Sequence, residues 1–319
     1  MNGTTISEFI LLGFSFPHTS QVFLFTLVMS CYIIIFLGNF LIMATVMSEP
    51  QLQHCPMYFF LANLSLTDVA MGSVIAPKFA LDLLNSGHTI SYGGCMAQLF
   101  FLHVFGGAEM LLLTLMAYDR YLAICHPLRY TVIMDQQCCL RLLMGCWIGG
   151  LIHSTIQMIT VAHLPFCGPN VLDNFYCDVP QVIKLACTDT YTFDILMILN
   201  SSLLTLPCFL ILLLSYIIIL VTICGHFGKG DGRKILSTCS SHLTVVSLFY
   251  VPCIIVYVNP NTQMNKLASL FYVVATPALN PFIYTLRNQE VKASMKKLKH
   301  KCKSLLMLQQ YRCERNCCV

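Results

Sequence analysis

A few charged side chains interrupt long apolar stretches of this chain. Asp68 and Glu109 lie inside two such stretches, and Asp119 and Arg120 stand together near the end of the second. A charge in hydrocarbon is costly, so an ionisable residue there marks a functional position, typically one that binds an ion or moves a proton. The alternative is structural: the two carboxyls bond to each other and only lock helix packing.

Other reactive side chains argue against catalysis. A retinal Schiff base needs a lysine within the seventh apolar stretch, and Lys266 lies only at its outer edge. An intramembrane aspartyl protease needs paired aspartates, and Asp68 is the one available in mid-membrane. Cys239 and His242 are spaced for packing in a helix rather than for a metal site. We expect no enzymatic activity, no cofactor and no metal.

The composition shows what environment holds these side chains. Of 319 residues, 57% are hydrophobic and 10% are charged, and the net charge is +4. A soluble domain carries about 25% charged residues, so this chain cannot cover a water-facing surface. A helix of about 20 apolar residues crosses the hydrocarbon of a bilayer. Seven blocks of that kind occur, at about residues 22–47, 57–77, 94–124, 142–164, 195–224, 235–258 and 267–286.

Lysine and arginine indicate the orientation, because cytoplasmic loops carry an excess of them. With the N-terminus outside, the outer segments hold only Lys78, Lys184 and Lys266. The cytoplasmic side holds Arg120, Arg129, Arg141, Lys229, Arg233, Lys234 and the basic residues of the tail. We expect an all-α membrane protein with an extracellular segment over residues 1–21, a seven-helix bundle over 22–286 and a cytoplasmic tail over 287–319. The net charge then reflects topology and does not indicate nucleic-acid binding.

The tail begins with an amphipathic pattern over about residues 287–303. The apolar positions are Val291, Met295, Leu298 and Cys302, and the flanking lysines are Lys292, Lys296, Lys299 and Lys303. This spacing predicts a basic helix on the inner leaflet, attracted to anionic lipid.

Several cysteines fall on the predicted outer side, namely Cys95, Cys167, Cys177 and Cys187. An even set in an oxidising space indicates disulfides, and the sequence alone allows three pairings. Asn2 opens an Asn-Gly-Thr sequon on the same side, which predicts glycosylation.

Short motifs follow one another along the chain in a recognisable order. They are Gly38-Asn39, Pro56-Met57-Tyr58-Phe59-Phe60-Leu61, Leu64-Ser65-Leu66-Thr67-Asp68, the MAYDRYLAIC run over 116–125, Ser215-Tyr216, Ser237-Thr238-Cys239-Ser240-Ser241-His242 and the PALNPFIY run over 277–284. As an ordered set they resemble the olfactory receptors of the rhodopsin-like G-protein-coupled receptors. One departure is Gln53-His54-Cys55 before Pro56, where that family usually has Leu-His-Thr.

The resemblance implies a switch at the cytoplasmic side. Asp119 holds Arg120 inward at rest, and the arginine is released to contact a G protein; Tyr121 completes the motif. An arginine that merely reaches lipid phosphate is the alternative, and it does not explain the flanking residues. The residues implied to rearrange with it are Tyr216, Asn280, Pro281 and Tyr284.

The resemblance also assigns partners to the buried acids and the outer cysteines. It implies that Asp68 and Glu109 face each other near Asn39 and Asn280, as a cation or proton site that favours the inactive state. It implies a disulfide between Cys95 and Cys177 and another between Cys167 and Cys187.

A ligand pocket is implied in the outer halves of the third, fifth, sixth and seventh spans. The matching positions are Leu102, His103, Gly106, Gly107, Asn200, Ser201, Tyr250, Cys253, Ile254 and Tyr257. The outer third span has no carboxylate to pair with an amine, and the outer sixth has no base to pair with a carboxylate. We expect a small neutral odorant whose first polar contact is His103, although a purely structural role for this histidine is the alternative.

The implied function is an odorant receptor of the plasma membrane that activates a stimulatory G protein and raises cyclic AMP. One alternative is a seven-helix receptor for a small molecule that is not an odorant. Another is a transporter, which should show repeated halves with interrupted helices, and no such repeat is seen in the sequence.

Overall fold

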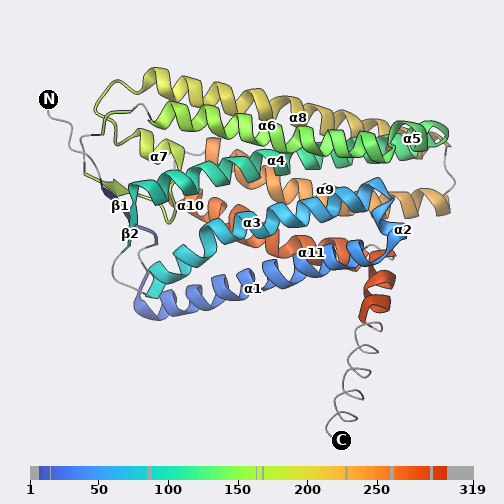
Figure 1. Ribbon diagram of the computed structural model, residues 1–319, viewed down its shortest axis with the longest axis horizontal. Helices are drawn as coiled ribbons and strands as arrows, with labels where there is room; N and C mark the ends of the chain where they lie inside the picture. Colours follow the sequence, from blue (N-terminus) through green and yellow to red (C-terminus); the bar gives the residue numbers. More distant parts are fainter. Residues whose placement is uncertain are drawn as a thin grey trace, which may run out of the picture.

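Seven long helices lie side by side along one axis (Figure 1). The computed structural model describes residues 7–14, 16–84, 88–162, 164–166, 169–226, 229–258, 262–287 and 290–299. Within them, the side chains of residues 18, 226, 229–235, 237, 238, 257, 258, 262, 286 and 287 are outside the description. In the described part, seven helices are long and apolar enough to cross a membrane, which confirms the predicted seven-helix bundle.

The spans are continuous helices except for the last. Six of them are α1 (His18–Ser48), α3 (Pro56–Leu84), α4 (Tyr92–Cys125), α6 (Gln136–Ala162), α8 (Tyr191–His226) and α9 (Lys229–Val258). The seventh consists of α10 (Thr262–Leu270), the π-helical turn η1 (Phe271–Ala275) and α11 (Thr276–Arg287). Helices form here because hydrocarbon offers no hydrogen bonds, so every backbone group must be satisfied within its own segment. Prolines occur inside α3, α8, α9 and α11. They are tolerated because groups on neighbouring helices can bond to the carbonyls that each proline leaves without a partner.

Short helices connect the spans. They are α2 (Pro50–Gln53), α5 (Pro127–Ile133) and α7 (Val179–Ile183). Proline stands in the first turn of each, where its missing N–H costs nothing because that group would have no helical partner. At the outer end, the Ser91 hydroxyl accepts a hydrogen bond from the Gly94 N–H at 3.1 Å and caps α4.

A further helix over residues 290–299 follows the seventh span and runs across the bundle axis (Figure 1). Val291 is fully buried and Met295 packs against the core, whereas Lys292, Lys296 and Lys299 are exposed. This is the predicted amphipathic helix with its apolar side against the bundle. Cys302 and Lys303, also assigned to it, lie outside the described residues.

The opposite end of the bundle carries a small sheet that the sequence did not predict. Its middle strand is β1 (Glu8–Leu11), which pairs antiparallel with β2 (Thr89–Ser91) and parallel with β3 (Val171–Leu172). Phe9 is 0% and Leu11 is 1% exposed, so this N-terminal segment is part of the packed structure. Figure 1 shows β1 and β2 together at the end opposite to residues 290–299.

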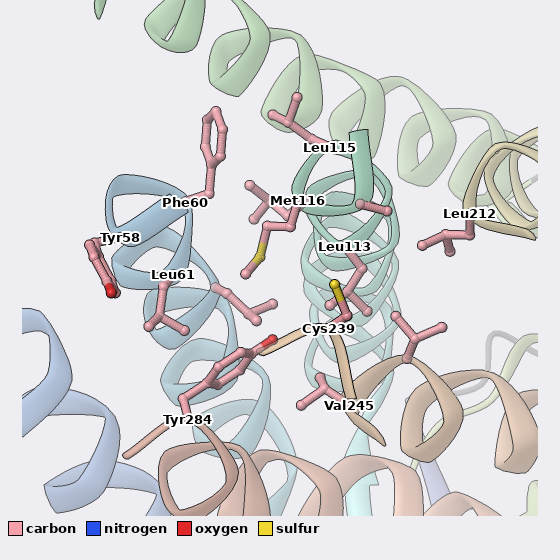
Figure 2. Packing of buried hydrophobic residues seen from close by; sticks show 14 of the residues in the cluster. Tyr58, Phe60, Leu61, Leu113, Leu115, Met116, Leu212, Cys239, Val245 and Tyr284 are labelled. Carbon is pink, nitrogen blue, oxygen red and sulfur yellow. The ribbon is translucent and has the colours of Figure 1, made fainter. Parts of the chain in front are cut away.

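The inner half of the bundle contains the largest apolar core (Figure 2). Tyr284 reaches from α11 toward the space between α3 and α4, near Leu61. α11 also lies directly on α1, since a Cβ atom added at Gly38 would be 2.9 Å from the Cβ of Pro281. Only glycine permits that approach, which fixes the proline-containing helix against α1.

Candidate functional site

A cavity of about 430 Å³ lies in the outer half of the bundle, between α4, α8, α9 and the seventh span. Sites for small molecules typically have about 300–1,000 Å³ and mostly apolar walls. Most of the pocket positions implied by the family resemblance lie on its wall. These are Leu102, His103, Gly106, Gly107, Ser201, Tyr250, Cys253 and Ile254.

Two implied pocket positions differ. Asn200 is not among the residues that line the cavity: its Nδ2 donates to the backbone carbonyl of His153 at 3.2 Å, so it ties α8 to α6. A neighbour on α8, Ser201, faces the cavity, because successive helical residues point about 100° apart. The side chain of Tyr257 lies outside the described residues.

Hydrogen bonds to neighbouring residues orient two polar side chains of the cavity wall, His103 and Ser201. His103 Nδ1 is 2.8 Å from the Leu99 carbonyl, which can only accept, so this nitrogen carries the proton and Nε2 is left as an acceptor. The His103 and His153 rings lie 5.8 Å apart by their centroids. Gln157 donates to the Ser201 hydroxyl at 3.0 Å, which leaves that hydroxyl able to donate into the cavity. These two side chains therefore offer a hydrogen-bond acceptor and a donor in a mostly apolar space.

The loop before α8 supplies a roof that the sequence argument missed. Tyr176, Cys177 and Asp178 all line the cavity, and the Tyr176 hydroxyl donates to Ser269 at 3.2 Å. Burial raises the pKa of Asp178 to about 6, although the backbone N–H of Val179 and the charge of a nearby lysine lower it. The carboxyl is thus mostly ionised at neutral pH. The sequence feature that could have identified Asp178 as a lining residue is its position directly after Cys177, which the disulfide holds over the cavity.

The roof is tied to the third span by the disulfide between Cys95 and Cys177, whose Cα atoms are 5.5 Å apart. This is the pairing that the resemblance implied. The Gln98 side chain accepts a hydrogen bond from the Cys177 N–H at 2.8 Å beside it. Cys187 is also disulfide-bonded. Its implied partner Cys167 lies outside the described residues, as does the glycosylation sequon at Asn2.

A second polar cluster lies deeper, in mid-bundle. Asn280 donates to both carboxyl oxygens of Asp68, at 3.1 and 3.0 Å. Asp68 and Glu109 are each 1% exposed and lie close enough to interact electrostatically. Asn39 donates to the Pro277 carbonyl at 3.2 Å. Among the described residues, one Glu109 carboxyl oxygen and the Asn39 amide oxygen find no hydrogen-bond donor, so the cluster holds spare acceptors.

The Asp119–Arg120 pair lies at the inner end of α4. Arg120 donates from Nε and from a terminal nitrogen to one Asp119 oxygen, at 3.1 and 2.7 Å. Tyr130 of α5 donates to the other oxygen at 2.7 Å, and Asp119 is fully buried. Burial first, and then the Asp119 charge, raise the pKa of Tyr130 far above its ordinary value, so the phenol keeps its proton. Tyr121 is instead hydrogen-bonded to His126 at 3.0 Å.

Two of the other positions implied to rearrange, Tyr216 and Tyr284, lie in the apolar core of the inner half. The Tyr216 hydroxyl is hydrogen-bonded to His242, which links α8 to α9 and gives His242 a partner other than Cys239. The buried hydroxyl of Tyr284 has no partner among the described residues. Tyr58, which opens α3, donates to Glu290 at 2.7 Å and links that helix to residues 290–299.

Known proteins share this arrangement. A sequence model of the olfactory receptor family matches residues 28–301. Human olfactory receptor 4Q3 is 55% identical over 300 residues, which is 93% of this chain and 96% of that protein. Mouse olfactory receptor 4E2 is 48% identical over 303 residues, or 94% and 98% of the two chains.

A solved structure supports the same fold. Squid rhodopsin superposes with a TM-score of 0.70 at 16% identity, over 90% of this chain and 82% of that one. The fold is therefore rhodopsin-like, and the ordered motifs, the roofed cavity and the sequence matches agree. The chain belongs to the olfactory receptor family, and as a member of it is a multi-pass G-protein-coupled receptor of the plasma membrane and not an enzyme.

Proposed function

We propose that this receptor binds a small neutral odorant in the 430 Å³ cavity and then activates a stimulatory G protein, which raises cyclic AMP. The observation that carries the ligand class is the mostly apolar wall in which His103 Nε2 is an oriented and uncharged acceptor. A neutral imidazole accepts a hydrogen bond from an alcohol or phenol without requiring a charge on the ligand. Lys and Arg do not occur among the described lining residues, which argues against a carboxylate ligand.

Asp178 favours a second candidate, a small amine. The carboxyl lies on the roof of the same cavity and could pair with a protonated amine, which the sequence argument had set aside for lack of a counter-ion. The neutral odorant remains our first choice because His103 lies deeper in the wall and needs no compensation for desolvating a charge.

The ligand class can be tested by replacing His103 with Phe, which keeps a flat ring and removes the acceptor. For an alcohol or phenol that activates the wild type, we expect the EC50 to rise by about ten- to hundredfold. The buried hydroxyl of the ligand would lose its acceptor, which costs about 1–3 kcal/mol of binding free energy. Cyclic AMP is measured in cells at matched surface level. His88→Phe is the control, since His88 lies outside this cavity.

The outcome separates the two candidates. If an amine activates the receptor, and its potency falls in Asp178→Asn but not in His103→Phe, the ligand class is a small amine. An unchanged EC50 in His103→Phe for every active alcohol contradicts the role given to His103.

We also propose that Asp68, Glu109, Asn39 and Asn280 bind a cation or a proton that favours the resting state. Two acids so close in a medium of low dielectric are costly, and a bound positive charge offsets that cost. The alternative is that the carboxyls only lock the packing of α3 and α4. The spare acceptor atoms support the cation or proton site, since a closed packing network would use them.

Asp68→Asn separates these alternatives. We expect basal cyclic AMP to rise about fivefold and its suppression by sodium to disappear, because an effector coupled to a two-state equilibrium contributes about 1 kcal/mol or more. The assay compares basal activity in sodium and in N-methylglucamine buffers. Asp82→Asn serves as the control, because Asp82 pairs with Lys78 one helical turn away at the outer end of α3. Unchanged basal activity together with unchanged sodium sensitivity favours the packing role.

A further inference from the structure

The cavity reaches the lipid-facing surface between α8 and α9. Ile198, Leu206 and Ile254 line the cavity, yet they are 53%, 59% and 50% exposed. All three lie within membrane spans, where an exposed side chain contacts lipid acyl chains. The same side chains therefore border the cavity on one side and the bilayer on the other.

Contacts between α8 and α9 explain where this opening lies. The two helices touch in the inner half, where Tyr216 bonds to His242, and at mid-depth, where the Phe209 and Tyr250 rings are 5.6 Å apart. Taken over their whole lengths, α8 packs mainly on α4 and α6, α9 packs mainly on α10 and α11, and the two helices contact each other little. Residues that border the cavity from α8 and α9 include Ser202, Thr205, Cys253 and Val256.

The extracellular end is closed by comparison. Lys266 is 4% exposed and donates to the Gly13 carbonyl at 2.9 Å and to Asp173 at 2.5 Å, which fastens the N-terminal segment and the roof loop to the seventh span. Beneath this tie, Phe14 and Phe175 stack with their centroids 5.6 Å apart. The three-stranded sheet and the disulfide between Cys95 and Cys177 also lie at this end of the described structure.

We propose that ligands enter the cavity sideways from the outer leaflet of the bilayer, between α8 and α9, rather than through the extracellular roof. Small apolar molecules leave water for hydrocarbon spontaneously, so the membrane concentrates them beside this opening. The rim carries aliphatic and small hydroxyl side chains and no charge, and a charged molecule would have to lose its hydration shell to pass. The bilayer thus acts as the first filter on which molecules reach the site.

The native thiol of Cys253 reports on this route, because it lies on the cavity wall. The full-length receptor in phosphatidylcholine vesicles is treated with N-phenylmaleimide, which dissolves in lipid, or with a quaternary-ammonium methanethiosulfonate, which stays in water. Modification of Cys253 is followed over time by peptide mass spectrometry and compared with Cys224, an exposed thiol of α8. The proposal predicts that only the lipid-soluble reagent reaches Cys253.

Narrowing the opening should slow this reaction. We expect Leu206→Trp to lower the rate at Cys253 about tenfold relative to Cys224, since a raised steric barrier acts exponentially on rate. The matched control is Leu203→Trp, on the same helix, 78% exposed and away from the cavity. Ile254→Trp with Val251→Trp as its control repeats the test from α9, in case one substitution impairs folding.

Other results overturn the proposal. Equal rates in Leu206→Trp and Leu203→Trp, or equal modification of Cys253 by the two reagents relative to Cys224, exclude the lateral opening. If the charged reagent modifies Cys253, and does so faster in Lys266→Ala, ligands enter through the roof. The inference rests on the proposed function only in treating the cavity as a ligand site. Because the assay needs no odorant and no signalling, its failure leaves the proposed function intact, and a silent odorant panel leaves this test valid.

Discussion

Replacing Arg120 with Gln should abolish the odorant-stimulated rise in cyclic AMP while the receptor still reaches the cell surface. Arg120 is mostly buried and makes two charge-assisted hydrogen bonds to Asp119, so it is held against α4 in this structure. A guanidinium stays charged and needs an acceptor in either position, which suits it to alternate between Asp119 and a G protein. Glutamine keeps a polar amide but loses the charge. The measurement is cyclic AMP against an active odorant at matched surface level.

Two variants make this result specific. Arg141→Gln removes an exposed arginine at the cytoplasmic end of α6 and should signal as the wild type does. Asp119→Asn should have the opposite effect and raise basal activity, because it weakens the resting partner while Tyr130 and Arg120 remain. A wild-type response in Arg120→Gln would show that this arginine only stabilises the bundle or binds lipid phosphate.

Replacing Gly150 with Val should strongly destabilise the receptor. A Cβ atom at this position would lie 2.5 Å from the Val104 carbonyl oxygen and 2.9 Å from the Ala108 nitrogen. Both are backbone atoms of α4, so no side chain can move aside and α6 must shift outward. Such overpacking typically costs about 1–3 kcal/mol, and the Ser154 hydrogen bond to the Phe100 carbonyl, at 2.7 Å, lies next to the strained contact. Thermal unfolding in detergent and the fraction of receptor at the surface are the measurements.

Gly145→Val provides the matched control for this substitution. It lies on the same helix, and a Cβ atom there meets nothing within 4 Å. We expect it to unfold at or above the wild-type temperature, because valine has a better helix propensity than glycine. If both variants unfold at the same temperature, the close approach of α4 and α6 contributes nothing to stability.

The spans were predictable because each one is encoded locally. The apolar block of α8 contains no charged residue from Ile195 to Cys224, and a segment of that length in hydrocarbon has no alternative to a helix. The amphipathic spacing of residues 290–299 is equally local, and its apolar side is buried as expected. The place of Arg120 at the inner end of the third span was also predictable, because the apolar block before it is local; its role in signalling stays a prediction.

Features that depend on contacts between distant segments were not predictable from local sequence. Asp178 stands in a loop, and only the disulfide to the third span brings it over the cavity. Asn200 is next to a lining residue in sequence, but its orientation is decided by the carbonyl of His153 on another helix. The strand β1 pairs with segments far along the chain, and a short apolar run such as Phe9 to Leu11 does not reveal such partners.

The place of β1 in the middle of its sheet also determines the order of assembly during synthesis. This strand is synthesised before both of its partners, and β3 is translocated only after α6 has been inserted. Until then, the edge of β1 that pairs with β3 is unpaired in the lumen of the endoplasmic reticulum, next to the apolar side chains of Phe9 and Leu11. A nascent receptor should therefore expose an apolar strand edge to luminal chaperones from the insertion of α1 until its second extracellular loop arrives. Release from quality control should accordingly follow completion of the outer sheet.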